Sequence, residues 1–250
     1  MGMTPPILAP SSPDLCWLDV ETTGLDPRTG SLLEVGVILT DWSLTEIARA
    51  SWPLRFDGEV SETIALMHGA AGSGLLADCR QAAHTREAVE VELSAWLRAF
   101  HVTKATMLAN NSADFDRRWL REHLPAVETM LSHRNLDLTS LDYAMGRWFD
   151  LSLRRDKDVP HRALPDLDMA LTRARAYRDH GEAVRRLVAT VPKCQTCGAV
   201  TTKWHVTDEG DEPFYRCADC GYDNGAWKGE PVPWDAEAVA RLTPRPGRAG

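Results

Sequence analysis

Apolar residues in the first hundred positions form three short runs followed by one helical stripe. The runs at residues 15–20, 32–40 and 47–56 have the length and flanks of strands, and they predict a β-meander. A turn is expected at residues 22–30, which contain two Gly and a Pro. Residues 85–100 repeat their apolar side chains at helical spacing and predict an amphipathic helix.

Later segments mix helices with further strands. We expect a short strand at residues 106–109, a helix at 114–124 that ends before Pro125, and another strand ending near Asp137. A helix then runs through Phe149, and Pro165 fits the first turn of a long helix reaching about residue 188. Residues 68–74 (HGAAGSG) predict a loop. This order favours an α/β fold with a mixed sheet.

The character of the chain changes after Pro192, where Cys pairs and Gly replace the helical pattern. We therefore predict four parts: a flexible leader at residues 1–14, a main domain at 15–190, a small Cys-rich module at 191–235 and a disordered tail at 236–250.

Composition narrows the class of protein. A formal net charge of −8 argues against a large surface that wraps nucleic acid, yet it leaves room for a site that holds a few nucleotides. No apolar stretch approaches the roughly 18 residues that span a bilayer, and the leader lacks the features of a secretory signal. Cys16 and Cys79 are isolated, so no disulfide framework is expected, and the pattern predicts a cytoplasmic protein without membrane contacts.

Two carboxylates follow the first strand. Asp19 and Glu21 are two residues apart, so their side chains share one face while Val20 points into the core. Neighbouring carboxylates repel each other, and a cation between them relieves the repulsion. The alternative is a strand that merely ends in acidic residues.

Further acidic residues lie at the starts of two expected helices. Asp116 is near the start of the first helix, and His161 precedes Asp166 by five positions at the start of the long helix. The helix dipole alone favours acids at such places, including Asp114 and Asp168. That alternative explains each acid separately, but not the ordered set.

The order Asp-x-Glu, Asp, His-x4-Asp resembles the signature of the DEDDh exonucleases, which have an RNase H-like fold with a mixed sheet flanked by helices. Within that family the chain is most similar to oligoribonuclease, from about residue 15 to 180. The stretches that carry the resemblance are WLDVETTGLDP, NNSADFDRRWL, HRNLDLTSLDYAMGRW and HRALPDLDMAL.

The resemblance implies a metal-dependent 3'→5' exonuclease that releases 5'-mononucleotides by a two-metal mechanism. His161 would be the general base, and two Mg²⁺ or Mn²⁺ ions would bind four carboxylates. These are Asp19, Glu21, Asp116 and Asp166. The Asp-Arg-Arg context selects Asp116 over Asp114, and the His-x4-Asp spacing selects Asp166 over Asp168.

The resemblance also implies contacts to a short single-stranded RNA. Leu25 would pack on a base, and His68 lies in the loop that closes over the nucleotide. Residues matching the cap on the 5'-phosphate are Ser112, Arg134, Thr139 and Ser140. For Arg134 a surface salt bridge is the alternative. Thr63 and His133 stand where the family has Trp and Tyr, and these departures leave single-stranded DNA open as a substrate.

Four cysteines form two knuckles near the C-terminus. Cys194, Cys197, Cys217 and Cys220 occur as two Cys-x2-Cys-Gly motifs, a pattern typical of a structural Zn²⁺ site in a zinc ribbon. Four free thiols or an iron–sulfur cluster are the alternatives. Aromatic and basic residues around the knuckles are suited either to single-stranded nucleic acid or to packing the small core of the ribbon.

Three further hypotheses stay open. The chain could act on DNA 3' ends as a proofreading-like exonuclease, bind nucleic acid without cleaving it, or serve as an adaptor through its zinc ribbon. Because members of the family that this chain resembles are typically homodimers, we expect a homodimer.

Overall fold

The computed structural model describes residues 12–149, 151 and 161–190, together with 196, 203–205, 214–216, 220 and 223–226. The chain divides into two compact units, Met1–Ala176 and Tyr177–Gly250. Most of the expected leader and all of the expected tail lie outside the described residues. Within the described part, no helix has both the length and the apolar character needed to cross a bilayer.

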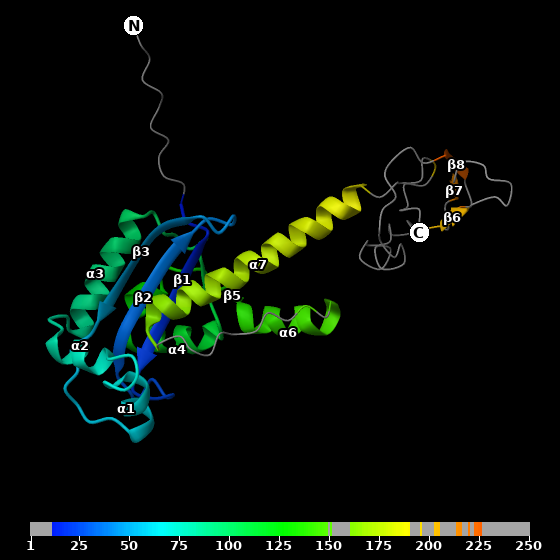
Figure 1. Cartoon of the computed structure of the whole chain (residues 1–250). Helices are drawn as coiled ribbons and strands as arrows, with labels where there is room; N and C mark the ends of the chain where they lie inside the picture. The colour runs from blue at the N-terminus through cyan, green and yellow to red at the C-terminus, as the bar shows by residue number, and fades with distance from the viewer. Residues whose placement is uncertain are drawn as a thin grey trace, which may run out of the picture. The chain divides into compact units, whose positions relative to one another are not determined.

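The first unit is built on a five-stranded mixed sheet with strand order β3-β2-β1-β4-β5. Its first three strands are antiparallel, whereas β4 and β5 run parallel to β1 (Figure 1). The strands are β1 (Leu15–Thr22), β2 (Leu32–Thr40), β3 (Glu46–Pro53), β4 (Met107–Asn110) and β5 (Asn135–Asp137). The helices are α1 (Glu62–His68), α2 (Leu75–Gln81), α3 (Arg86–Ala99), α4 (Ala113–His123), α5 (Pro125–Glu128), α6 (Leu138–Phe149) and α7 (Ala163–Thr190), which continues across the division between the units.

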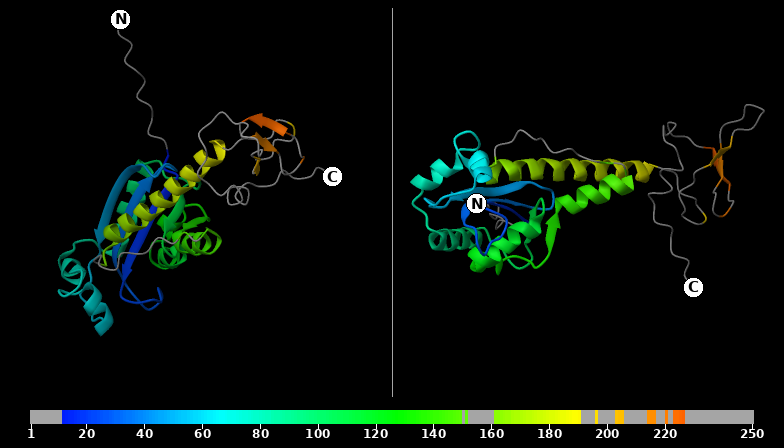
Figure 2. Two further views of the ribbon diagram at one scale, coloured as in Figure 1. Left: turned by 45° about the vertical axis from the view of Figure 1, so that its right-hand side comes forward. Right: turned by 90° about the horizontal axis from the view of Figure 1, so that it is seen from below.

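The central strands are buried on both faces. Every residue of β2 is buried, and all of β1 is buried except Asp19, which is half-buried. Such strands are nearly continuously apolar because helices cover both sides of the sheet. Figure 2 shows α3 and the beginning of α7 on opposite sides of it.

Strand alternation divides the core into two layers. Cys16, Leu18 and Val20 of β1 belong to the layer shared with α3 and α4. Leu15 and Trp17 belong to the layer shared with the first turns of α7. Asp19 and Glu21 continue this second series, so the sheet directs both carboxylates toward the face covered by α7.

The predicted fold class is confirmed, and the main differences concern the ends of elements. The third strand was expected to continue to residue 56 but ends at Pro53, where the chain leaves the sheet. The short helices α1 and α2, on either side of the predicted loop at residues 68–74, were not predicted. Each has only seven residues, too few to produce a recognisable helical period.

The described strands of the second unit form a three-stranded antiparallel sheet with order β6-β7-β8. They are β6 (Lys203–His205), β7 (Phe214–Arg216) and β8 (Asp223–Ala226).

Gly36 allows α7 to begin close to the sheet. It pairs with Asp19 across β1 and β2, and a Cβ atom at this position would lie 2.6 Å from the Cβ of Ala163. Real Cβ atoms do not approach so closely, so a side chain here would push the first turn of α7 outward. That turn carries Asp166.

We predict that Gly36→Ala lowers the free energy of unfolding by about 1–3 kcal/mol, the usual cost of overpacking a core. Urea unfolding measures it. Gly24→Ala is the matched control, because a Cβ there meets nothing within 4 Å. Equal stability of the two variants would contradict the close approach.

Candidate active site

Three carboxylates from two elements meet at the end of β1. Asp19 and Glu21 extend from β1, and Asp166 comes from the first turn of α7. Each offers an oxygen, and these oxygens lie within 4.8 Å of one another. Residues almost 150 positions apart in the sequence are therefore brought to one point.

Asp116 joins the group from α4 through hydrogen bonds. Its Oδ1 accepts from the Val20 amide at 3.2 Å, and its Oδ2 accepts from Asn110 Nδ2 at 3.1 Å. The same Nδ2 donates to Asp19 Oδ1 at 2.8 Å. Asp116 is buried in the first turn of α4. All four predicted carboxylates thus belong to one cluster.

The two acidic residues that do not match the motif, Asp114 and Asp168, lie outside the carboxylate cluster. Asp114 is 74% exposed and pairs with Arg118 one helical turn away. Asp168 pairs with Arg49 of β3 through both of its oxygens. These partners leave both residues outside the carboxylate cluster.

Burial and mutual repulsion raise the pKa values of three of the clustered carboxyl groups. Burial, followed by the charges of Asp166 and Glu34, raises the pKa of Asp19 to about 7 even though Asn110 donates to it. Burial and the neighbouring Asp19 raise the pKa of Glu21 to about 9. The same two causes, in the same order, raise the pKa of Asp116 well above its ordinary value.

The donor set fits hard divalent cations. Mg²⁺ and Mn²⁺ prefer carboxylate oxygens, and at this site several are held close together. Glu21 Oε1 is buried and accepts no hydrogen bond within the described part of the chain. A cation would both satisfy this oxygen and offset the repulsion within the cluster.

One histidine contacts the carboxylate cluster, and a second lies next to it. His161 is exposed and shortly precedes α7, and its ring centroid lies 6.2 Å from that of the buried His68. His68 Nε2 is 3.6 Å from Glu21 Oε2. Burial, and next the charge of His161, lower the pKa of His68. The predicted loop histidine therefore contacts the cluster through Glu21, and the predicted base lies next to that histidine.

A salt-bridge network that sequence reasoning missed anchors the segment carrying His161. Arg162 binds both oxygens of the buried Glu34, at 3.0 and 2.9 Å, and reaches Asp78 of α2 at 2.7 Å. Glu34 also accepts from the Ala163 amide, so β2 holds the start of α7. The one signal in the sequence is the charge of Glu34 within the apolar run of residues 32–40.

The predicted cap residues are partly brought together. Ser112 donates its amide to Thr139 Oγ1 at 3.1 Å, and the two hydroxyl oxygens lie 3.2 Å apart. Ser140 donates its amide to Asp137. Arg134 is exposed, and its guanidinium has no hydrogen bond or ion pair to any residue that the structure describes. Leu25 is 82% exposed in the turn after β1, free to contact a ligand.

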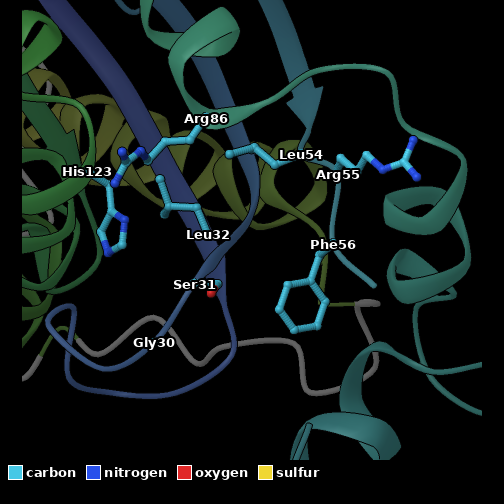
Figure 3. A pocket seen from close by; sticks show the side chains of 8 residues that line it. All are labelled: Gly30, Ser31, Leu32, Leu54, Arg55, Phe56, Arg86 and His123. Carbon is cyan, nitrogen blue, oxygen red and sulfur yellow. The ribbon is translucent and has the colours of Figure 1, made fainter. Parts of the chain in front are cut away.

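A separate cavity of about 330 Å³ lies between the start of β2, the segment after β3, and the ends of α3 and α4 (Figure 3). Its lining includes Leu32, Leu54, Phe56, Arg86 and His123. None of the predicted site residues lines it, so it is distinct from the carboxylate cluster.

The predicted zinc site falls mostly outside the described residues. Cys194, Cys197 and Cys217 lie there, and Cys220 occupies an exposed turn. The zinc ribbon stays a prediction.

Comparison with known proteins identifies the family. The family model described as Exonuclease matches residues 16–172, well over half of the chain. The match includes all five residues predicted to carry the chemistry. The chain belongs to this exonuclease family. It is accordingly an enzyme of the 3'→5' exonuclease class.

Curated relatives of this exonuclease include oligoribonucleases. That of Pseudomonas syringae pv. tomato is 33% identical over 174 residues, which are 67% of this chain and 95% of the relative. That of Neisseria meningitidis serogroup A is 31% identical, over 67% of this chain and 91% of the relative. The similarity thus spans nearly the whole length of these relatives.

Solved structures confirm the fold. Exonuclease I of E. coli in complex with single-stranded DNA superposes with a TM-score of 0.53 at 15% identity, over 72% of this chain. Exonuclease I of Methylocaldum szegediense gives 0.52 at 17% identity, over 80% of this chain. The exonuclease spans 43% and 50% of those two proteins, respectively.

The raised pKa values predict that the metal-free protein loses stability as pH rises. Between the ordinary values of 3.8 and 4.5 and the folded values of about 7 and 9, the folded state binds more protons than the unfolded chain. Stability therefore falls with rising pH across about pH 4–9. Urea unfolding at several pH values in EDTA measures this slope.

Added Mg²⁺ should flatten the decline, because a bound cation stabilises the ionised carboxylates. Glu21→Gln, whose side-chain amide has no proton to lose in this pH range, should have a shallower slope in EDTA than the wild type. An identical slope in the two proteins would contradict the electrostatic account.

Proposed function

We propose that this chain is a DEDDh-type exonuclease that removes 5'-mononucleotides from the 3' end of short single-stranded RNA with two divalent cations. The convergence of Asp19, Glu21 and Asp166 within 4.8 Å is the observation that carries the proposal. Asp116, linked to Asp19 through Asn110, would complete the set of ligands. A motif scattered over about 150 residues needs no such convergence unless the acids act together.

Each residue has a distinct part in this proposal. The four carboxylates would hold cations that, when bound about 4 Å apart, neutralise charge on the scissile phosphate and activate water. His161, exposed at the edge of the cluster, would accept the proton from the attacking water. Glu34 would hold the His161 segment in place through Arg162.

Short RNA is proposed as substrate because the curated relatives are oligoribonucleases. The adjoining hydroxyls of Ser112 and Thr139 have the chemistry to bind a terminal phosphate, and so does the guanidinium of Arg134, which has no partner among the described residues. Single-stranded DNA is the second candidate. Thr63 and His133 favour it. Each stands where the family that the chain resembles has Trp or Tyr, and those residues would restrict the range of substrates.

We further propose that residues 191–235 form a zinc ribbon with Cys194, Cys197, Cys217 and Cys220 as ligands. The support is the spacing of the two knuckles. Metal analysis should find one zinc per chain, and none in a variant with all four cysteines replaced by serine. Zinc retained by that variant would overturn the assignment.

The decisive experiment is product analysis on 5'-labelled RNA and DNA from two to about thirty nucleotides long, with Mg²⁺ or Mn²⁺. We expect the shortest RNA to be cleaved fastest, with 5'-mononucleotides as products. Asp116→Asn should abolish nearly all cleavage, whereas Asp114→Asn, on the exposed side of the same helix, should retain it. Full activity in Asp116→Asn would remove this residue from the site, and faster cleavage of DNA would replace the proposed substrate.

His161→Ala should lower kcat by about 10²–10⁴-fold, the usual contribution of a general base. His84→Ala is the control, because this histidine lies outside the cluster and pairs with Glu92. An unchanged kcat in His161→Ala would assign the base to another group.

A further inference from the structure

Asn110 connects two of the clustered carboxylates at the end of β4. We propose that it is a positioning residue, whose side-chain amide sets the spacing and orientation of Asp19 and Asp116 before cations bind. The inference rests on the proposed function, because it assigns a role toward the cations of that site. Neither the resemblance nor the motif spacing pointed to this residue.

The two N–H groups of the Asn110 amide face three oxygen acceptors. Nδ2 lies 2.8 Å from Asp19 Oδ1, 3.1 Å from Asp116 Oδ2 and 2.9 Å from the Leu18 carbonyl oxygen. Oδ1 accepts from the Asn111 amide at 2.7 Å. One side chain therefore contacts β1 and α4, two elements that each supply a ligand.

The hydrogen-bond partners also fix which way the amide points. Rotating it by half a turn would place Oδ1 against three oxygen acceptors and Nδ2 against the Asn111 N–H group. Every contact would then be repulsive, so only the observed orientation is compatible with the surroundings. The amide is 1% exposed, which leaves it with these protein partners.

The carboxylates keep capacity for a cation while the amide holds them. An ionised carboxylate has about four lone-pair sites, and the described contacts use two on Asp116 and one on Asp19. Asp116 is held at both oxygens, by Asn110 and by the Val20 amide, so its plane is set relative to β1.

A neutral donor suits this place better than a charged one. A Lys or Arg would neutralise the carboxylates and compete with the cations for them. An amide donates hydrogen bonds without adding a positive charge, so the full negative charge of the cluster stays available. Partners that orient metal ligands in this way usually contribute about 10–100-fold to metal affinity or activity.

Calorimetric titration of the full chain with Mn²⁺ alone tests the inference. Asn110→Ala should bind Mn²⁺ about 10–100-fold more weakly than the wild type. Asn110→Ser keeps one donor in a smaller side chain and should fall between the two. Asn135→Ala is the matched control: its amide accepts a hydrogen bond from Arg117, away from the cluster, and its Mn²⁺ affinity should equal that of the wild type.

Kinetics give a second readout. In Asn110→Ala the Mn²⁺ concentration that gives half-maximal activity should rise, while the KM for substrate at saturating Mn²⁺ stays unchanged. A merely structural asparagine would lower the unfolding temperature, as in Asn135→Ala, without this shift.

Wild-type Mn²⁺ affinity in a folded Asn110→Ala would overturn the inference. So would failure of both Asn110 variants to fold, because Asn110 would then be a folding determinant. If the wild type itself neither binds Mn²⁺ nor cleaves nucleic acid, the proposed function fails instead. The two failures are thus distinguishable.

Discussion

Electrostatic repulsion among buried carboxylates is the constraint on which the rest of the site depends. Asp19, Glu21, Asp116 and Asp166 come from three elements and meet where water is largely excluded. Concentrating acids in this way destabilises a folded chain unless protons or cations compensate. Burial and the neighbouring Asp19 accordingly raise the pKa of Glu21 to about 9. Cations held between these carboxylates would offset the repulsion.

Three features of the fold keep the cluster assembled against this repulsion. Gly36 leaves room for α7 to start directly on the sheet, which brings in Asp166. The bidentate pair of Glu34 and Arg162 fastens the same segment to β2. Asn110 fixes Asp116 relative to Asp19. Each feature links elements that are distant in the sequence, so the site exists only in the complete fold.

The sequence predicts the parts of this structure that repeat a regular pattern. The strands at residues 15–20 and 32–40 and the helix at 85–100 were found because burial imposes uninterrupted or periodic apolar residues on them. The carboxylates were found because the motif fixes their order. Contacts between distant segments leave no such pattern: Glu34 looked like one charge in an apolar run, and Asn110 like a polar stop after a strand. Their roles depend on pairing across 128 and 91 positions, which only the fold brings about.

We propose that the four carboxylates form one site for two divalent cations. Anomalous diffraction from crystals of the full chain soaked in Mn²⁺ tests it most directly. Two manganese peaks about 4 Å apart are expected between Asp19, Glu21, Asp116 and Asp166, and both should be lost in Asp166→Asn. A protein that binds manganese only elsewhere, or whose peaks persist in Asp166→Asn, would contradict it.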